Sequence, residues 1–210
     1  MRMDIIQANG YQLELGSILE SSFADKLQSY SNEKIILFAD EHTSEACVSY
    51  LLAQFNELLS EAEIIVIPAG ELNKTVAIVE NIWEVMSDYQ VSRHDLLVNV
   101  GGGMITDMGG FIASCYKRGI EFINVPTSLL GMVDASIGGK TGVNLGHFKN
   151  QVGVFSHPIA VYIDPLFLST LPAEELMSGY AELLKHGLIS DFSLYEDVLR
   201  QMEAPAEISV

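Results

Sequence analysis

LLVNVGGGMITD, residues 96–107, is an apolar run followed by three glycines and the start of a helical pattern. The apolar run is typical of a strand buried on both faces of a parallel sheet. Glycines let the backbone approach a phosphate closely, and the first turn of the next helix offers free N–H groups and positive dipole. The spacing is not GxGxxG, so these residues predict an anion or nucleotide site without selecting the ligand. Asp107 is expected in the first helical turn, either as a cap or as part of the site.

The same alternation of apolar runs and helical patterns extends along most of the chain. Further apolar runs lie at 34–39, 64–67, 122–125 and 160–163, and helical patterns at 44–59, 74–89 and 105–116. Strands alternating with helices predict an α/β fold, a Rossmann-like layered parallel sheet with right-handed crossovers. The sequence also predicts an N-terminal hairpin, with strands at Asp4–Gln7 and Tyr11–Leu15 and a turn at Asn9-Gly10.

The pattern changes after Asp164. Residues 172–188 and roughly 191–202 form helical patterns, and no further strand follows them. We therefore predict an α/β domain over residues 1–170 and the incomplete start of an all-helical domain over residues 171–210. Under about forty residues bury too little surface for a helical domain, which predicts that the sequence is part of a longer protein.

The composition is that of a folded, acidic protein. Of 210 residues, 49% are hydrophobic, and the formal net charge is −17. So much negative charge argues against nucleic acid or anionic lipid as a partner. Cys47 and Cys115 lack CxxC or Cys/His spacing, which predicts free buried thiols in a reducing compartment. The sequence shows neither a signal-peptide pattern nor a membrane-length apolar run, so no membrane association and a cytoplasmic location are expected.

Acids and a glycine-flanked lysine mark two more candidate sites. Asp40 and Glu71 follow predicted strands, a position from which an acid can hold a ribose hydroxyl, although surface acids are common in so acidic a chain. VPTSLLGMVDASIGGKTGVN, residues 125–144, begins as strand and helix and enters a Gly-Gly-Lys-Thr-Gly turn. Asp134 occupies the first glycine position of GxxxxGKT, which argues against a P-loop. Lys140 lies close in the sequence to Lys149 and Asn150, and side chains of these types suit a compact phosphate group. The alternative is that this segment is a solvated loop.

GYAELLKHG, residues 179–187, is the third candidate site. Helical spacing places Glu182, Lys185 and His186 on one face. A Glu–Lys pair at this spacing is usually a surface ion pair, but the apolar and small neighbours favour a cleft. Glu182 is a candidate metal ligand and His186 a candidate second one, and the residues alone do not choose between these interpretations.

These blocks, in this order, resemble the 3-dehydroquinate synthase family from about Asp40 to Asp191. The resemblance rests on residues 68–75 (PAGELNKT), 101–111 (GGGMITDMGGF), 117–119 (KRG), 125–143, 149–150, 164–172 and 179–187. It implies that the α/β domain binds NAD and that the helical domain binds metal and substrate.

The resemblance also implies roles for individual residues. NAD is expected along Asp40, Glu71, Lys74, Gly102, Gly103, Asp107, Thr127 and Ser128, with Thr170, Leu171 and Glu175 closing over it. Glu182 is expected to be one of three ligands of zinc, or another divalent metal such as cobalt. The other two are histidines absent from this chain, and in the family His186 is not a ligand. The sugar-phosphate substrate is expected to contact Asp134, Lys140, Lys149, Asn150 and Lys185, while Arg118 reaches the phosphate in the partner subunit of a homodimer.

The implied activity is that of a cyclising, phosphate-eliminating lyase of the shikimate pathway to aromatic amino acids. It converts 3-deoxy-arabino-heptulosonate 7-phosphate into 3-dehydroquinate and phosphate, with NAD reduced only transiently. Because the missing metal ligands belong to the helical domain, the isolated chain is expected to be inactive. The alternatives are another sugar-phosphate cyclase, a metal-dependent polyol dehydrogenase and a non-catalytic NAD-binding module.

Overall fold

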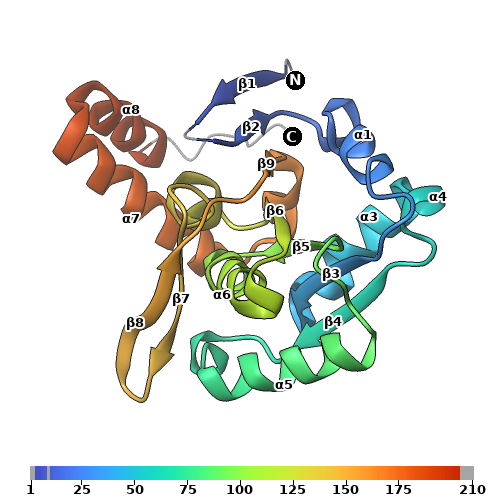
Figure 1. Cartoon of the computed structure of the whole chain (residues 1–210). Coiled ribbons are helices and arrows are strands. Elements are labelled where there is room, and N and C mark those ends of the chain that lie inside the picture. The colour runs from blue at the N-terminus through green and yellow to red at the C-terminus, as the bar shows by residue number, and fades with distance from the viewer. Residues whose placement is uncertain (1–2, 9, 204–210) are drawn as a thin grey trace.

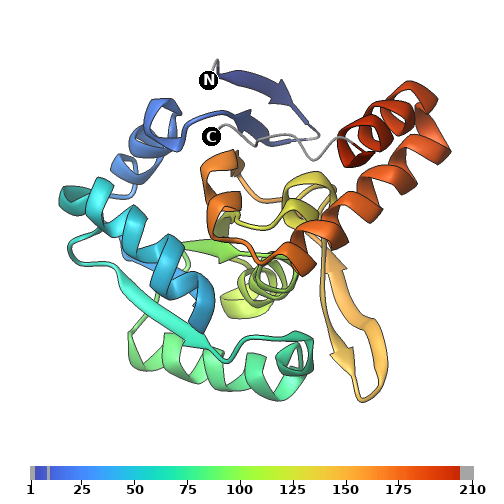
Figure 2. The same ribbon diagram turned by 180° about the vertical axis from the view of Figure 1, so that it is seen from behind.

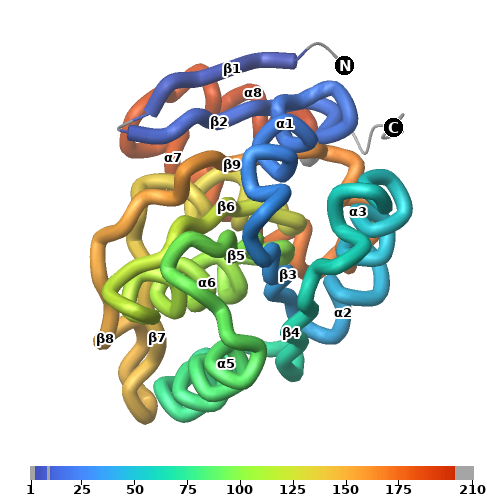
Figure 3. The backbone as a smooth tube through the Cα atoms, turned by 45° about the vertical axis from the view of Figure 1, so that its right-hand side comes forward, coloured from blue at the N-terminus to red at the C-terminus, as the bar shows by residue number. Residues whose placement is uncertain are grey.

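The apolar runs form a seven-stranded sheet in a computed structural model that describes residues 3–8 and 10–203. Its spatial order is β1-β2-β9-β6-β5-β3-β4, and Figure 3 shows these strands in that sequence from one edge to the other. Every described neighbour pair is parallel except the hairpin β1–β2. The strands are β1 (Asp4–Gln7), β2 (Gln12–Leu15), β3 (Ile35–Asp40), β4 (Glu63–Ile67), β5 (Leu96–Gly101), β6 (Glu121–Pro126) and β9 (Ala160–Ile163).

Helices cover both faces of the sheet and bury two apolar clusters (Figures 1 and 2). Successive residues of β3 point to opposite faces, so Ile36 and Phe38 join one cluster while Leu37 and Ala39 join the other. On one face lie α5 (Val76–Asp88) and α6 (Gly103–Cys115); on the other lie η1 (Ile18–Glu20), α1 (Phe23–Gln28), η2 (Ser44–Val48), α3 (Ser49–Gln54), α4 (Asn56–Leu59) and η6 (Pro165–Thr170). The predicted α/β class with a layered parallel sheet is confirmed.

The structure corrects three local predictions. The helix expected over 44–59 is interrupted: α2 (Glu41–Thr43) leads into the π-helical η2, and the helix breaks at Phe55, whose φ is −117° and ψ 36°. The Phe55 ring is buried edge-on against Phe23, 5.1 Å between centroids, and this contact accompanies the break. Strand β4 is not buried on both faces, because as an edge strand it leaves Ile64 and Val66 exposed. Cys115 is exposed, whereas Cys47 is buried as expected.

A second, two-stranded sheet was not predicted. Strands β7 (Lys140–Leu145) and β8 (Phe148–Phe155) form an antiparallel hairpin that projects from the body of the molecule (Figure 1). Gly142 faces Gly153 across the hairpin, where a Cβ on Gly153 would lie 2.1 Å from the Thr141 carbonyl oxygen. The glycines therefore allow a close backbone approach that interrupts the alternation by which strands are recognised.

The remaining elements follow the predicted pattern closely. The N-terminal hairpin pairs Asp4 with Leu15 as expected, although Asn9 of its turn lies outside the described residues. Helices α7 (Ala173–Ser190) and α8 (Phe192–Glu203) pack on each other, with Gly187 against the backbone of Tyr195. The short elements η3 (Glu71–Asn73), η4 (Tyr116–Arg118) and η5 (Gly131–Ala135) complete the described chain. The division at residue 170 stays a prediction. Within the described residues, no helix is both long and apolar enough to cross a membrane.

Gly109 is where α6 lies closest to the sheet, and it gives a first testable prediction. A Cβ at this position would lie 1.9 Å from Oδ1 of Asn99 in β5. We expect Gly109→Ala to lower the free energy of unfolding by about 3 kcal/mol, at the upper end of the cost of overpacking. Urea unfolding of this variant and of Gly146→Asn measures the effect; Gly146 lies in open space, and asparagine tolerates its φ of 59°. Equal losses in both variants would contradict the close packing.

Candidate functional site

The carboxyl ends of three adjacent strands bring the predicted nucleotide-binding residues to one edge of the sheet. β3 ends at Asp40, β5 leads into Gly102 and Gly103, and β6 leads into Thr127 and Ser128. In open parallel sheets, ligands bind outside the carboxyl ends of the strands. The sheet order therefore gathers residues that are far apart in the sequence at a place suited to a nucleotide.

The glycine turn between β5 and α6 is closely covered by the loop after β6. A Cβ on Gly102 would lie 3.1 Å from Ser128 Oγ, and one on Gly103 would lie 3.0 Å from Ala135 Cβ. Gly102 is the N-cap of α6, and no side chain of the described chain caps this helix end. The first N–H groups of α6 therefore stay available to an anionic ligand.

Asp107 does not cap α6, so that interpretation is wrong. It is the fifth residue of the helix, past the first turn, and its Oδ2 accepts a hydrogen bond from Nζ of Lys74 at 2.6 Å. Burial raises the pKa of Asp107 above its ordinary value, and the Lys74 ammonium only partly opposes this shift. The carboxylate thus depends on a cation from another part of the chain.

Lys74 joins the glycine block, residues 101–111, to the β7–β8 hairpin. Its side chain is 3% exposed, and its ammonium also donates to Oδ1 of Asn150 in β8, at 2.6 Å. Glu71, three residues earlier, accepts from Nδ2 of Asn144 in β7 at 3.0 Å. Lys149 brings a second, exposed ammonium to 4.0 Å from Glu71 Oε1. The expected NAD-side residues Glu71, Lys74 and Asp107 are therefore in one network with the expected substrate-side residue Asn150.

Two other predicted cofactor contacts lie around β3 and η6. Asp40 Oδ1 caps α2, accepting from the N–H groups of His42 and Thr43 at 3.0 and 2.9 Å. Thr170, at the end of η6, lies 3.9 Å from the sulfur of Cys47, linking η6 to the helix after β3. Burial raises the pKa of the Cys47 thiol, so it is held as a neutral group. Leu171 follows η6, and Glu175 is exposed in the first turn of α7.

A pocket of about 400 Å³ lies between Asp107 of α6, the segment 134–137 and the β7–β8 hairpin. It contains the acid Asp107 together with three of the predicted substrate residues, Asp134, Lys140 and Asn150. The other lining residues are Ala135, Ile137, Thr141, Gly142, Gln151, Gly153, Val154 and Phe155. The pocket thus offers an ammonium and an amide to an anion, and a carboxylate to a hydroxyl.

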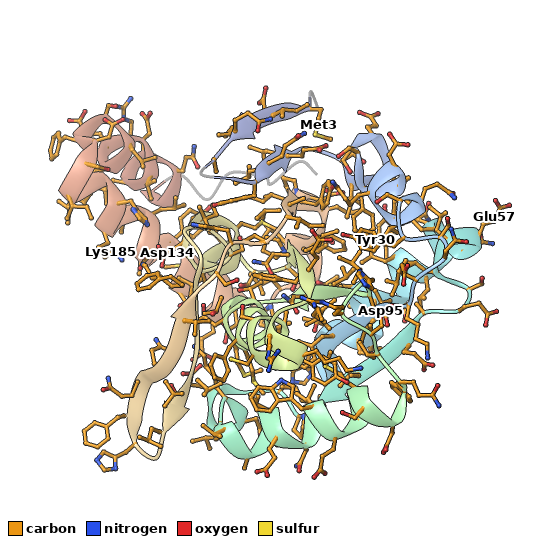
Figure 4. All side chains as sticks on the ribbon, viewed as in Figure 1. Met3, Tyr30, Glu57, Asp95, Asp134 and Lys185 are labelled. Atoms are coloured by element: carbon orange, nitrogen blue, oxygen red, sulfur yellow. The ribbon has the colours of Figure 1, made fainter. Side chains whose placement is uncertain are left out.

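Helix α7 carries the third predicted group to the side of this pocket. Glu182 pairs with Lys185, and Nε2 of His186 lies 3.3 Å from Glu182 Oε1 and 3.8 Å from Asp134 Oδ1. Figure 4 shows Asp134 and Lys185 beside each other where α7 passes the base of the hairpin. The shared face of the three α7 residues is confirmed, and Asp134 joins them from η5.

The donor set of this cluster fits a divalent metal ion. One ligand atom from each of Asp134, Glu182 and His186 lies within 4.8 Å of the others. Nε2 of His186 is buried and forms no hydrogen bond with any described residue. An imidazole nitrogen without a hydrogen-bond partner therefore lies beside two carboxylates. Imidazole and carboxylate are common ligands of zinc. Glu182, the predicted metal residue, is therefore placed where a metal can be held.

Arg118 is not brought to this cluster. It is exposed beyond the C-terminal end of α6, whereas the glycines start that helix. A helix of this length separates its two ends by about 20 Å. Lys117 and Arg118 both have positive φ, 48° and 71°, in the tight turn that connects α6 to β6.

Two contributors were missed by the sequence analysis. Asn144 contacts both halves of the network, but as part of an unrecognised strand it carried no signal beyond its place after Thr-Gly-Val. The approach of Asp134 to His186 joins η5 to α7 across about fifty residues, which no spacing rule reveals.

Comparison with known proteins places the chain in a family. Residues 64–178 match the model described as 3-dehydroquinate synthase N-terminal. The chain is 45% identical over 181 residues to a 3-dehydroquinate synthase of Parabacteroides distasonis, covering 86% of this chain and 51% of that protein. It is 39% identical over 195 residues to one of Clostridium acetobutylicum, covering 88% and 55%. The chain thus spans about half the length of the curated relatives it matches.

Solved structures of sugar-phosphate cyclases share the fold. ValA, a 2-epi-5-epi-valiolone synthase from Streptomyces hygroscopicus subsp. jinggangensis 5008 with NAD⁺ and Zn²⁺ bound, superposes with a TM-score of 0.78 at 31% identity, covering 96% of this chain and 56% of that one. A 2-deoxy-scyllo-inosose synthase complexed with carbaglucose-6-phosphate, NAD⁺ and Co²⁺ gives 0.76 at 28% identity, covering 90% and 52%. Together with the match over 64–178, these likenesses establish that the chain belongs to the 3-dehydroquinate synthase N-terminal family.

Proposed function

We propose that this chain is the cofactor-binding half of a 3-dehydroquinate synthase, which converts 3-deoxy-arabino-heptulosonate 7-phosphate into 3-dehydroquinate and phosphate. The observation that carries the proposal is the Lys74 bridge, which ties Asp107 of the glycine block to Asn150 beside the pocket. A reaction in which a cofactor acts on a phosphorylated sugar needs nucleotide-binding and phosphate-binding groups in contact with each other. The curated relatives of the chain carry the same name.

The residues of the chain divide the work of binding. Gly102 and Gly103 would admit the NAD pyrophosphate to the N-terminus of α6, and Glu71 would hold a ribose hydroxyl. Lys140, Lys149 and Asn150 would bind the substrate phosphate, and Asp134 and Lys185 its hydroxyl groups. Glu182 would hold the divalent metal, with the nearby His186 nitrogen as a further donor.

Cofactor and metal would complete the chemistry. When bound, NAD supplies a reversible hydride acceptor and the metal polarises a substrate hydroxyl. The chain's contribution is to fix the sugar relative to both and to stabilise the departing phosphate with Lys140 and Lys149. Arg118, which does not line the pocket of its own chain, would act on the phosphate of a partner subunit in a homodimer.

Another sugar-phosphate cyclase is the second candidate, favoured by the likeness to ValA and to 2-deoxy-scyllo-inosose synthase. The two candidates share NAD, metal and a phosphorylated sugar, and they differ in the product. Chromatographic product analysis of two fusions of this chain, with the C-terminal half of the Parabacteroides distasonis relative and with that of ValA, separates them by which fusion turns over. Formation of 3-dehydroquinate supports the first candidate, and a cyclitol or valiolone-type product supports the second.

The isolated chain is expected to bind NAD and to release no phosphate. Calorimetric titration of NAD measures the first property, and a phosphate assay with substrate, NAD and zinc measures the second. A folded chain that binds no NAD would contradict the proposed function. Phosphate release by the isolated chain would contradict only the prediction that the missing half is needed, and NADH accumulation would indicate a dehydrogenase.

A further inference from the structure

Asn144 connects the segment 71–74 to the β7–β8 hairpin through both its backbone and its side chain. Its backbone N–H donates to the Lys74 carbonyl oxygen at 2.9 Å, and its Nδ2 donates to Glu71 Oε1 at 3.0 Å. Its Oδ1 accepts from the backbone N–H of Asn150 at 2.9 Å. The side chain is 9% exposed, so both ends of the amide are used away from bulk water.

These contacts close a ring between the segment 71–74 and the hairpin. From Glu71 the ring passes through Asn144 to the backbone of Asn150, and the Asn150 side chain returns to Lys74 at 2.6 Å. Asn150 has a φ of 54°, a conformation that costs energy for a residue other than glycine and needs support from its surroundings. The N–H accepted by Asn144 supplies that support.

Strand β7 is anchored on α6, where Val143 is buried in an apolar cluster and Val152 of β8 packs against it, but the rest of β8 lies outside that cluster. Seven of the eight residues of β8 are exposed, and the strand pairs only with β7 among the described elements. The ring therefore adds a polar link between the exposed part of β8, with Lys149 and Asn150, and the segment 71–74. A ligand that orders the segment 71–74 or the hairpin therefore also orders the other, because the Asn144 amide contacts both.

We propose that Asn144 is a positioning residue that couples dinucleotide binding at Glu71 and Lys74 to anion binding at Lys149 and Asn150. The inference rests on the proposed function, because it takes NAD as the ligand of the first segment. An anion that orders the hairpin fixes Asn144, which holds Glu71 ready for the ribose. Linkage requires NAD to strengthen anion binding by the same factor.

The test compares the NAD dissociation constant with and without inorganic phosphate, using the chain as it is. We expect saturating phosphate to tighten NAD binding about five-fold or more in the native chain. Asn144→Asp retains the acceptor for Asn150 N–H but sets a carboxylate against Glu71, and it should abolish the tightening. Asn56→Asp, at an exposed position on α4, is the matched control and should retain it.

Exchanging the donor and the acceptor of the hydrogen bond between residues 144 and 71 distinguishes a loss of coupling from a general loss of structure. In the double variant Asn144→Asp with Glu71→Gln, the glutamine amide donates to the new carboxylate, so the ring is restored with its donor and acceptor exchanged. We expect the phosphate effect to return even though Glu71→Gln weakens NAD binding itself, because the readout is the ratio of dissociation constants. Persistence of the effect in Asn144→Asp, or its absence from the double variant, would refute the role of Asn144.

Hydrogen exchange in the native chain provides a test that needs no variant. NAD should slow exchange of the Asn150 amide while leaving the Gly146 amide at the hairpin tip unchanged. NAD binding without this protection and without a phosphate effect would overturn the coupling but leave the proposed function intact. A native chain that binds no NAD would overturn both.

Discussion

Replacing Gly103 by Val is expected to weaken NAD binding by at least about 100-fold, a loss of close to 3 kcal/mol. A Cβ at this position already lies 3.0 Å from Ala135 Cβ, so the valine methyl groups must press on η5 or enter the space in front of α6. In either case the pyrophosphate loses its close approach to the first N–H groups of the helix. Calorimetric titration of NAD measures the change.

Two further variants make the Gly103 result specific. Gly103→Ala should give a smaller loss, about ten-fold, because one methyl group needs a shift of a few tenths of an ångström. Gly146→Asn is the control: it lies at the hairpin tip with φ of 59° and open space, and asparagine tolerates that conformation. Native affinity in a folded Gly103→Val chain would show that the dinucleotide does not bind at the glycine block.

Replacing Lys74 by Met is expected to lower the free energy of unfolding by about 3 kcal/mol at neutral pH. The side chain is 3% exposed, and its removal leaves both Asp107 Oδ2 and Asn150 Oδ1 without their donor. A buried carboxylate without its partner is costly, whereas a methionine fills the space of the lysine stem. Lys26→Met, a partly exposed lysine on α1, is the control and should change stability little.

The loss in Lys74→Met should shrink as the pH falls. The ammonium lowers the pKa of Asp107, so its removal raises that pKa further above the ordinary value. A carboxyl group whose folded-state pKa is raised destabilises the fold most when it is ionised in both states. As the pH falls through the raised pKa, the folded state takes up the proton first and regains stability. Urea unfolding at about pH 8 and about pH 5 should give the larger difference from native at pH 8, and an equal or larger difference at pH 5 would contradict the buried pairing.

The local pattern alone predicted the strands of the large sheet. Residues such as Ile35–Ala39 are apolar without interruption, and such runs are stable only when both faces are covered, so strand and layered fold follow together. The glycines after β5 were recognisable for a similar reason, since a backbone that its neighbours approach as closely as Ser128 and Ala135 do here tolerates no side chain. The family resemblance then named the residues of the site.

Only the tertiary structure decided how these residues act on one another. The break at Phe55 accompanies a ring contact with Phe23, and the hairpin β7–β8 depends on glycines facing each other across it. A helix cap was one of two interpretations of Asp107 because a cap is a local feature, but in the structure Asp107 pairs with Lys74, thirty-three residues earlier. The sequence determines which segments bury apolar surface. The pairing of buried charged groups depends on distances that are set by the whole sheet.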